Sequence, residues 1–272
     1  MNRELNGAEL AGFIKERQAK QVRGLRQAWQ IFPKLAIVTD SDNPVIATYV
    51  RLKERYGADI LIDVENHRVQ SSELKKTISE LNNRQDVHGI IVQLPLLNPS
   101  ETDEVLAEIL PSKDVDGLCI DSKFDAATPI AINWLLAGYN VELMGKKIAI
   151  VGRGRLVGAP LEKMWLNSNL NVTVFEEGDD LSRLANFDVI VTATGVPDLI
   201  RSEMVRLGAV VVDAGTASEH GKIVGDVASE VRNRTDVTIT PVKGGVGPLT
   251  VSALFDNVIL AARRVADQQN AN

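Results

Sequence analysis

Residues 148–160 read IAIVGRGRLVGAP, an apolar strand-like run that leads directly into three closely spaced glycines. Gly152, Gly154 and Gly158 allow a tight turn and a close backbone approach to a pyrophosphate. The helix expected to follow presents unpaired amides and the positive end of its dipole. The spacing GxGxxxG is one residue longer than the commonest dinucleotide fingerprint. The stretch therefore predicts a dinucleotide-binding turn, with a plain strand-turn-helix as the alternative.

The next strand-like run, residues 171–175, ends at Glu176 and Glu177. A βαβ unit places an acid at about this point against the ribose hydroxyls of NAD. Further strands are expected at 189–192 and 208–213. Thr194 follows the first of these at the edge where open α/β sheets bind ligands, so it is a candidate cofactor contact; an ordinary strand exit is equally compatible with the pattern.

The composition is that of a soluble globular protein: 272 residues, 44% hydrophobic and 24% charged, with a formal net charge of -6. That charge disfavours nucleic acid and anionic membranes as partners and favours small molecules. A single cysteine, Cys119, permits no intrachain disulfide and fits a cytoplasmic location. His67, His88 and His220 lack metal-ligand spacing, so no metal is predicted. We expect no signal peptide and no membrane span.

Strand-like and helical patterns alternate along the chain and predict an α/β fold with parallel sheets in two domains. In the first half the strands are expected at 35–38, 60–62 and 89–94, and helices are expected from Pro44 and Ser71. The stretch 111–129 reads as a passage between domains. A final helix, 249–266, is expected to return to the first domain. The predicted domains are 1–121 plus 249–272, and 122–248.

The helix expected from Pro44, with Asn43 as its N-cap, carries one lysine inside an apolar arc. The residues of that arc are Val45, Ile46, Tyr49, Leu52, Lys53 and Tyr56. Desolvation would lower the pKa of Lys53 and suit it to acid–base chemistry near neutral pH. Tyr49 lies one turn away, within reach of the same reacting group. On helix geometry alone, a lysine that buries its stem and keeps its head in water is the more common case.

Two further polar positions are candidates. Gln93 interrupts an otherwise apolar run, where it can be a structural hydrogen-bonding group or can orient Lys53. Asp114 and Asp116, in the run KDVDG, can hold a polar ligand or form an ordinary Asp-rich turn.

Several ordered motifs together resemble the methylenetetrahydrofolate dehydrogenase/cyclohydrolase family over nearly the whole chain. They are 49–53 (YVRLK), 92–96 (VQLPL), 113–117 (KDVDG), the glycine turn from Gly152 to Pro160, and 244–250 (GGVGPLT).

The resemblance implies a two-domain protein, usually a homodimer, with a folate cleft between an N-terminal α/β catalytic domain and a Rossmann-like domain. It implies oxidation of 5,10-methylenetetrahydrofolate to the methenyl form with NAD(P), and hydrolysis of that product to 10-formyltetrahydrofolate. By the same resemblance, Lys53 would be the acid–base group of the hydrolysis, Tyr49 would position the folate and Gln93 would tune Lys53. Asp116 would bind the pterin.

The remaining candidates divide between the two ligands. Those expected at the folate are Leu94, Pro95, Gly245, Gly247, Pro248 and Thr250. Those expected at the dinucleotide are Gly152, Arg153, Gly154, Arg155, Val157, Gly158, Glu176 and Thr194.

The chain departs from the family pattern at 126–131, where it reads AATPIA, at Gly154 in place of a Ser, at Lys243 in place of a Pro, and over 175–179. Glu176 would repel a 2′-phosphate and accept bonds from ribose hydroxyls, which favours NAD. Arg153 and Arg155 can each pair with a phosphate and keep NADP open. Two alternatives remain: a dehydrogenase without the hydrolytic step, and a folate- or nucleotide-binding protein without turnover.

Overall fold

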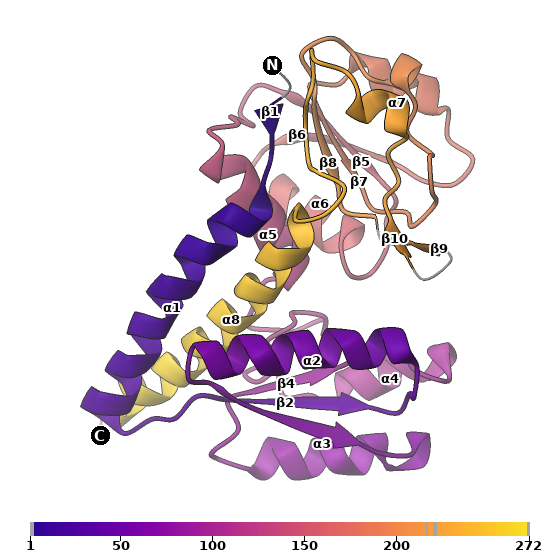
Figure 1. Cartoon of the computed structure of the whole chain (residues 1–272). Coiled ribbons are helices and arrows are strands. Elements are labelled where there is room, and N and C mark those ends of the chain that lie inside the picture. Colours follow the sequence, from indigo (N-terminus) through magenta and orange to yellow (C-terminus); the bar gives the residue numbers. More distant parts are fainter. Residues whose placement is uncertain (1–2, 216, 220–221, 271–272) are drawn as a thin grey trace. The chain divides into compact units, whose positions relative to one another are not determined.

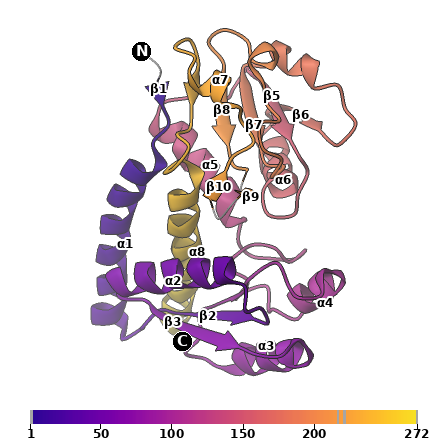
Figure 2. The ribbon, with the colours of Figure 1, turned by 45° about the vertical axis from the view of Figure 1, so that its right-hand side comes forward.

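The structure is a computed structural model that describes residues 3–215, 217–219 and 222–270. His220 therefore lies outside the described residues. The chain forms two compact units (Figures 1 and 2). Unit 1 comprises residues up to Ala11 and Thr128–Thr250, and unit 2 comprises Gly12–Ala127 and the chain from Val251.

Unit 1 contains a six-stranded sheet in the order β1-β11-β8-β7-β5-β6, with every neighbouring pair parallel. Its strands are β1 (Arg3–Glu4), β5 (Lys147–Val151), β6 (Asn171–Phe175), β7 (Val189–Thr192), β8 (Val210–Asp213) and β11 (Thr238–Ile239). A separate antiparallel hairpin joins β9 (Ala217–Glu219) and β10 (Lys222–Val224). The strand order reverses between β5 and β7, so the carboxyl ends of these two strands form the switch point where such sheets bind ligands.

Helices and short 3₁₀ turns connect the strands of unit 1. They are α5 (Ala127–Gly138), α6 (Gly158–Asn167), α7 (Ser229–Arg232), η3 (Leu181–Asn186) and η4 (Ser202–Met204). Helix α6 packs on β5 and β6, and the indole of Trp165 donates a 2.7 Å hydrogen bond to Asn133 of α5. The buried strands are nearly continuous runs of Val, Ile and Ala, as expected for a parallel sheet covered on both faces.

Unit 2 contains a three-stranded parallel sheet in the order β3-β2-β4. The strands are β2 (Lys34–Thr39), β3 (Asp63–Arg68) and β4 (Gly89–Val92); the helices are α2 (Pro44–Asp59), α3 (Leu74–Asn83) and α4 (Thr102–Ala107), and the 3₁₀ turns are η1 (Ser71–Glu73) and η2 (Pro99–Glu101). Figure 1 shows α2 on one face of this sheet and α3 on the other. The carboxyl ends of β2 and β4 therefore meet at one edge, beside α2.

Two long helices, α1 (Gly7–Trp29) and α8 (Val246–Asn270), continue from unit 1 into unit 2. Within unit 2 they are joined by a buried amide, because Gln18 Nε2 donates a 2.7 Å hydrogen bond to the carbonyl of Ser252. The predicted return of the last helix to the first domain is thus confirmed, although the helix starts at Val246, three residues earlier than predicted.

The expectation that no segment resembles a membrane span needs correction. The part of α8 from Val246 to Gln269 is long and apolar enough to cross a bilayer by length and composition. However, 61% of that stretch is buried inside the structure, which is typical of the core helix of a soluble protein.

The predicted strand at 60–62 is wrong. Ile60 and Ile62 are fully buried, but their amides bond back to the carbonyl of Gly57 and close the end of α2. Leu61 between them has φ 65° and is exposed. The strand in this region is β3, which begins at Asp63, directly after the predicted range. Its sequence DVENHR is polar because β3 lies at the edge of the sheet and has one neighbouring strand. The strands predicted at 171–175 and 189–192 are confirmed to the residue.

Candidate functional site

The lysine singled out in the sequence lies against the predicted glutamine. Lys53 projects from α2, and its Nζ donates a 2.7 Å hydrogen bond to Gln93 Oε1 at the carboxyl end of β4. Gln93 is itself held, because its backbone amide bonds to the carbonyl of Val38 and its Nε2 to that of Leu94. These two bonds, from the backbone amide and from Nε2 of Gln93, hold the side-chain oxygen toward the ammonium of Lys53.

Asp116 is the charged group that acts on the pKa of Lys53. Burial raises the pKa of Asp116 to about 6. The positive charge of Lys53 lowers this pKa, and the negative charge of Asp114 raises it further. Burial likewise lowers the pKa of Lys53, while the Asp116 charge opposes that shift. Both pKa shifts come mainly from desolvation, which moves the pKa of a lysine down and that of a carboxylate up, toward neutral pH.

Asp114 has a structural role. It is fully buried, and its Oδ2 accepts a 2.9 Å hydrogen bond from the backbone amide of Cys119. Its peptide unit also pairs with Ile90 of β4. Asp114 thus ties the loop that carries Asp116 to the sheet, and of the two predicted aspartates only Asp116 interacts with Lys53.

Helix α2 presents a different face from the one predicted. Asn43 caps it as expected, accepting a 2.9 Å bond from the amide of Val45. Its buried residues are Ile46, Val50 and Gly57, whereas Val45 and Leu52 are about half exposed. Gly57 sets this rotation, since a Cβ there would lie 2.5 Å from the side chain of Val64 on β3. Tyr49 and Lys53 remain half-buried, one turn apart.

The glycine turn of unit 1 has the form predicted for it. Gly152 has φ 92°, and a Cβ on Gly158 would lie 1.9 Å from the carbonyl oxygen of Gly152, so neither position accepts a side chain. Helix α6 begins at Gly158. By contrast Gly154 has open space around it, and Arg155 beside it is exposed. Gly152 and Gly158 thus make the turn tight, and Gly154 leaves space beside it. This arrangement fits the pyrophosphate of a dinucleotide.

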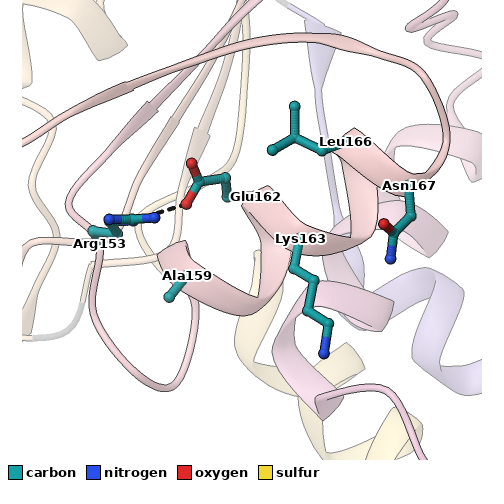
Figure 3. A pocket seen from close by; sticks show the side chains of 6 residues that line it. All are labelled: Arg153, Ala159, Glu162, Lys163, Leu166 and Asn167. Atoms are coloured by element: carbon teal, nitrogen blue, oxygen red, sulfur yellow. Dashed lines mark hydrogen bonds and ion pairs between the residues drawn. The ribbon is translucent and has the colours of Figure 1, made fainter.

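Arg153 is engaged by two carboxylates. Its Nε donates a 2.8 Å bond to Glu162 of α6, and its Nη1 lies 3.7 Å from Glu176 at the end of β6. Figure 3 shows Arg153 and Glu162 pointing toward one another. Both residues line a groove of about 490 Å³ along α6. Glu162 was not among the predicted residues, and no motif in the sequence marks it.

Thr194 packs on the same turn, since a Cβ on Gly152 would lie 3.0 Å from its methyl group. Both its amide and its hydroxyl donate to Asp226 Oδ2, at 2.7 and 2.9 Å, and Thr192 donates to the same oxygen at 2.6 Å. Asp226 is fully buried. The hydroxyl oxygen of Thr194 in turn accepts a 3.1 Å hydrogen bond from the amide of Val196. Sequence reasoning missed Asp226, whose only signal is its place as an acid inside the apolar run IVGDVA.

The segment 244–250 combines a turn with the start of α8. Gly244 has φ 84°, and its carbonyl accepts a bond from the amide of Ala8. Gly245 is buried, and a Cβ on Gly7 would lie 1.9 Å from its oxygen. Gly247 is exposed with open space around it, whereas Pro248 and Thr250 are half-buried in the first turn of α8. The close approach that requires glycine at 7 is thus made within the protein.

Among the described residues no group of three or more His, Cys, Asp and Glu side chains is placed to hold a metal ion.

A parallel sheet with a glycine turn at its switch point, in a chain that also holds a desolvated lysine beside a glutamine and a carboxylate, defines a class: two-unit α/β enzymes with a dinucleotide-binding unit.

The particular family follows from comparison with known proteins. Residues 5–116 match the tetrahydrofolate dehydrogenase/cyclohydrolase catalytic domain, and residues 126–266 match the NAD(P)-binding domain of the same family. The chain belongs to this family.

Named relatives align with this chain over almost its full length. The chain is 38% identical to the bifunctional protein FolD of Hydrogenobaculum sp. (strain Y04AAS1), over 96% of this chain and 98% of that protein. The crystal structure of the bifunctional enzyme FolD from Campylobacter jejuni superimposes with a TM-score of 0.92 at 35% identity, covering 97% of this chain and all of that one. The Trypanosoma brucei enzyme, complexed with NADP and an inhibitor, gives 0.89 at 30% identity over 97% of this chain and 98% of that one.

Proposed function

We propose that this chain oxidises 5,10-methylenetetrahydrofolate to the methenyl form with a nicotinamide dinucleotide and then hydrolyses the product to 10-formyltetrahydrofolate. The observation that carries the proposal is the 2.7 Å bond from Lys53 to Gln93, with both Lys53 and Asp116 desolvated. A protein that only bound nucleotide would have no need of a desolvated lysine, which costs stability.

For the oxidation, the dinucleotide supplies the hydride acceptor when it is bound. The residues of the chain would hold it: the turn from Gly152 to Gly158 would receive the pyrophosphate, and Thr194, just after β7, would contact the ligand. Val157 and Arg155 complete the turn. Orientation of the two reacting rings is the main demand of a hydride transfer.

For the hydrolysis, Lys53 moves the protons. Attack of water on the methenyl carbon forms a C–O bond and requires loss of one proton from the water. Breaking the bond from that carbon to the departing nitrogen requires a proton at the nitrogen, and the hydroxyl proton leaves to solvent as the formyl carbonyl forms. A lysine with a lowered pKa performs both steps in turn. Gln93 fixes the position of the ammonium, and Asp116 stabilises its protonated form as well as binding the pterin.

We further propose NAD as the preferred cofactor. Arg153, in the turn, already pairs with Glu162 and lies 3.7 Å from Glu176, so a 2′-phosphate on Arg153 would have to displace a carboxylate and would be repelled by Glu176. Ribose hydroxyls meet no such barrier. Glu176→Ser is expected to raise kcat/KM with NADP relative to NAD about tenfold, and an unchanged ratio would contradict this assignment.

The folate is proposed to contact Tyr49, Leu94, Pro95, Gly245, Gly247, Pro248 and Thr250. The functional domains are proposed as 1–121 plus 249–272 for folate and 122–248 for the dinucleotide. A cytoplasmic homodimer completes the proposal, and sedimentation of the purified chain at twice its 29.6 kDa mass is the expected result.

The test is to mix the purified protein with methylenetetrahydrofolate and either NAD or NADP, while following the absorbance of the methenyl product and of reduced nicotinamide. Turnover followed by decay of the methenyl signal supports both steps. Turnover with a stable methenyl signal supports a dehydrogenase alone. Binding of folate without any turnover supports a non-catalytic binding protein.

A further inference from the structure

The segment 117–125 lies between the two stretches that match the family domains, and it follows Asp116 directly. Its two ends are close together, because Gly117 has φ 71° and a Cβ there would lie 2.6 Å from the amide nitrogen of Ala126. The segment is therefore a closed loop, and the position of Asp116 depends on what holds its base.

One side chain of α8 holds both ends of that loop. Asn257 Nδ2 donates to the carbonyl of Val115 at 2.9 Å and to the carbonyl of Asp125 at 3.0 Å. Asn257 is 5% exposed; its bond to the Val115 carbonyl is buried, and its bond to the Asp125 carbonyl is partly buried. The Val115 carbonyl belongs to the peptide unit that precedes Asp116, and fixing that plane fixes the direction of the Asp116 Cα.

We propose that Asn257 is a positioning residue for folate binding: by joining the Val115 and Asp125 carbonyls, it places the Asp116 carboxyl relative to Lys53. The proposal rests on the function proposed above, in which Asp116 contacts the pterin.

The charges around Asp116 make its placement matter. Lys53 on α2 and Asp114, two residues before Asp116, are the charged groups that act on it, with opposite effects. Asn257 is neutral and reaches only backbone, so it adds no charge to the site. Loss of its two bonds removes the Asn257 donor from the buried Val115 carbonyl and from the partly buried Asp125 carbonyl, and it frees the loop to move Asp116 away from Lys53.

The same helix supplies a matched control. Arg264, two turns further along α8, donates a 3.2 Å bond to the carbonyl of Lys123 and lies 4.5 Å from the ring of Phe124. It touches the same loop at residues distant in sequence from Asp116. Arg264→Met therefore loosens the loop without releasing the peptide unit before Asp116.

The experiment measures folate binding calorimetrically without dinucleotide, and KM and kcat for methenyltetrahydrofolate hydrolysis, in the wild type, Asn257→Leu, Asn257→Ser and Arg264→Met. Asn257→Leu is expected to weaken folate binding and to raise KM about tenfold, with kcat changed less than about threefold. Arg264→Met is expected to leave both within about twofold. Asn257→Ser keeps a small polar group at the site and serves if the leucine variant fails to fold.

An Asp116→Ala background separates positioning from simple loss of stability. There the Asn257 substitution is expected to have no further effect on folate affinity, because the group it positions is gone. An equal loss of affinity in both backgrounds, or an unchanged KM in a folded Asn257 variant, overturns the inference. Failure of the wild type itself to bind folate instead overturns the proposed function.

Discussion

In unit 2 the candidate site consists of side chains that hold one another: Lys53 bonds to Gln93, and Asp116 shares the desolvated surroundings of the lysine. In unit 1 the candidate site consists of backbone, because Gly152 and Gly158 are fixed by the absence of side chains. Its charged groups, Arg153 and Glu176, are more than half exposed. The site in unit 2 provides groups for proton transfer, and their desolvation lowers the stability of the fold. The site in unit 1 provides a backbone shape that fits a ligand, and its exposed charges cost little stability.

The two sites should therefore fail in different ways. Substitution in the lysine site removes a proton-transfer group while the fold persists or is stabilised, since a buried charge disappears. Substitution in the glycine turn distorts backbone and removes a binding surface. A substitution in one site is therefore expected to leave the function of the other site intact.

The largest effect is expected from Lys53→Met. Methenyltetrahydrofolate hydrolysis should fall by about 10²–10⁴-fold, the usual contribution of an acid–base group. Dinucleotide binding should be unchanged, because the glycine turn is untouched. The measurement is the hydrolysis rate by absorbance, with Lys76→Met, which replaces an exposed lysine on α3, as the control. Full hydrolytic activity in the Lys53 variant would remove Lys53 from the mechanism.

A pH-dependent loss of stability is expected from Asp116. Its pKa is about 6 in the folded protein and about 3.9 in an unfolded chain, so the folded state binds the proton more tightly and stability falls as pH rises through that window. The loss is up to about 3 kcal/mol. Asp116→Asn removes it.

Urea unfolding of the wild type and Asp116→Asn between pH 4 and pH 7 measures this difference. The variant should gain stability relative to the wild type as pH rises. Parallel pH profiles for the two proteins would show that Asp116 is not desolvated.

Gly158→Ala tests the backbone site. The added methyl meets the Gly152 carbonyl oxygen at 1.9 Å, so the turn must shift, at a cost of about 1–3 kcal/mol. NAD affinity should fall at least about tenfold, while folate binding remains. Calorimetric titration with each ligand decides it, and an unaltered NAD affinity would mean that the turn does not bind the dinucleotide.

The smallest effect is expected from Gly154→Ser, the matched control within the same turn. Gly154 has open space around its Cα and no positive φ, so a side chain there meets nothing. Stability should change by less than about 0.5 kcal/mol and NAD affinity by less than about twofold. A loss as large as that of Gly158→Ala would show that the ligand itself occupies the space at Gly154.

What could be predicted from the sequence follows the same division. The apolar strands β5 and β7 and the glycine turn were predicted well, because a covered parallel strand and a phosphate-binding turn each leave a local pattern. The cap at Asn43 was predicted for the same reason. The edge strand β3 was misplaced by its polar sequence, and the short strand β1, Arg3–Glu4, was missed because two residues carry no periodicity.

The contacts between distant residues were less accessible. Lys53 and Gln93 are 40 positions apart, so the sequence pattern left open whether Gln93 orients Lys53 or is a structural hydrogen-bonding group, and the family resemblance favoured the first. Glu162, Asp226 and Asn257 act on residues up to 142 positions away and belong to no local motif. The rotation of α2 depends on how closely Gly57 approaches Val64, a packing fact that periodicity alone does not contain.

The most direct test of the separation between the two sites is the hydrolysis of methenyltetrahydrofolate with no dinucleotide present, measured in the wild type, Lys53→Met and Gly158→Ala. The wild type and Gly158→Ala are expected to hydrolyse it at similar rates, and Lys53→Met is expected not to hydrolyse it. Loss of hydrolysis in Gly158→Ala, or its retention in Lys53→Met, would contradict the separation of the two sites.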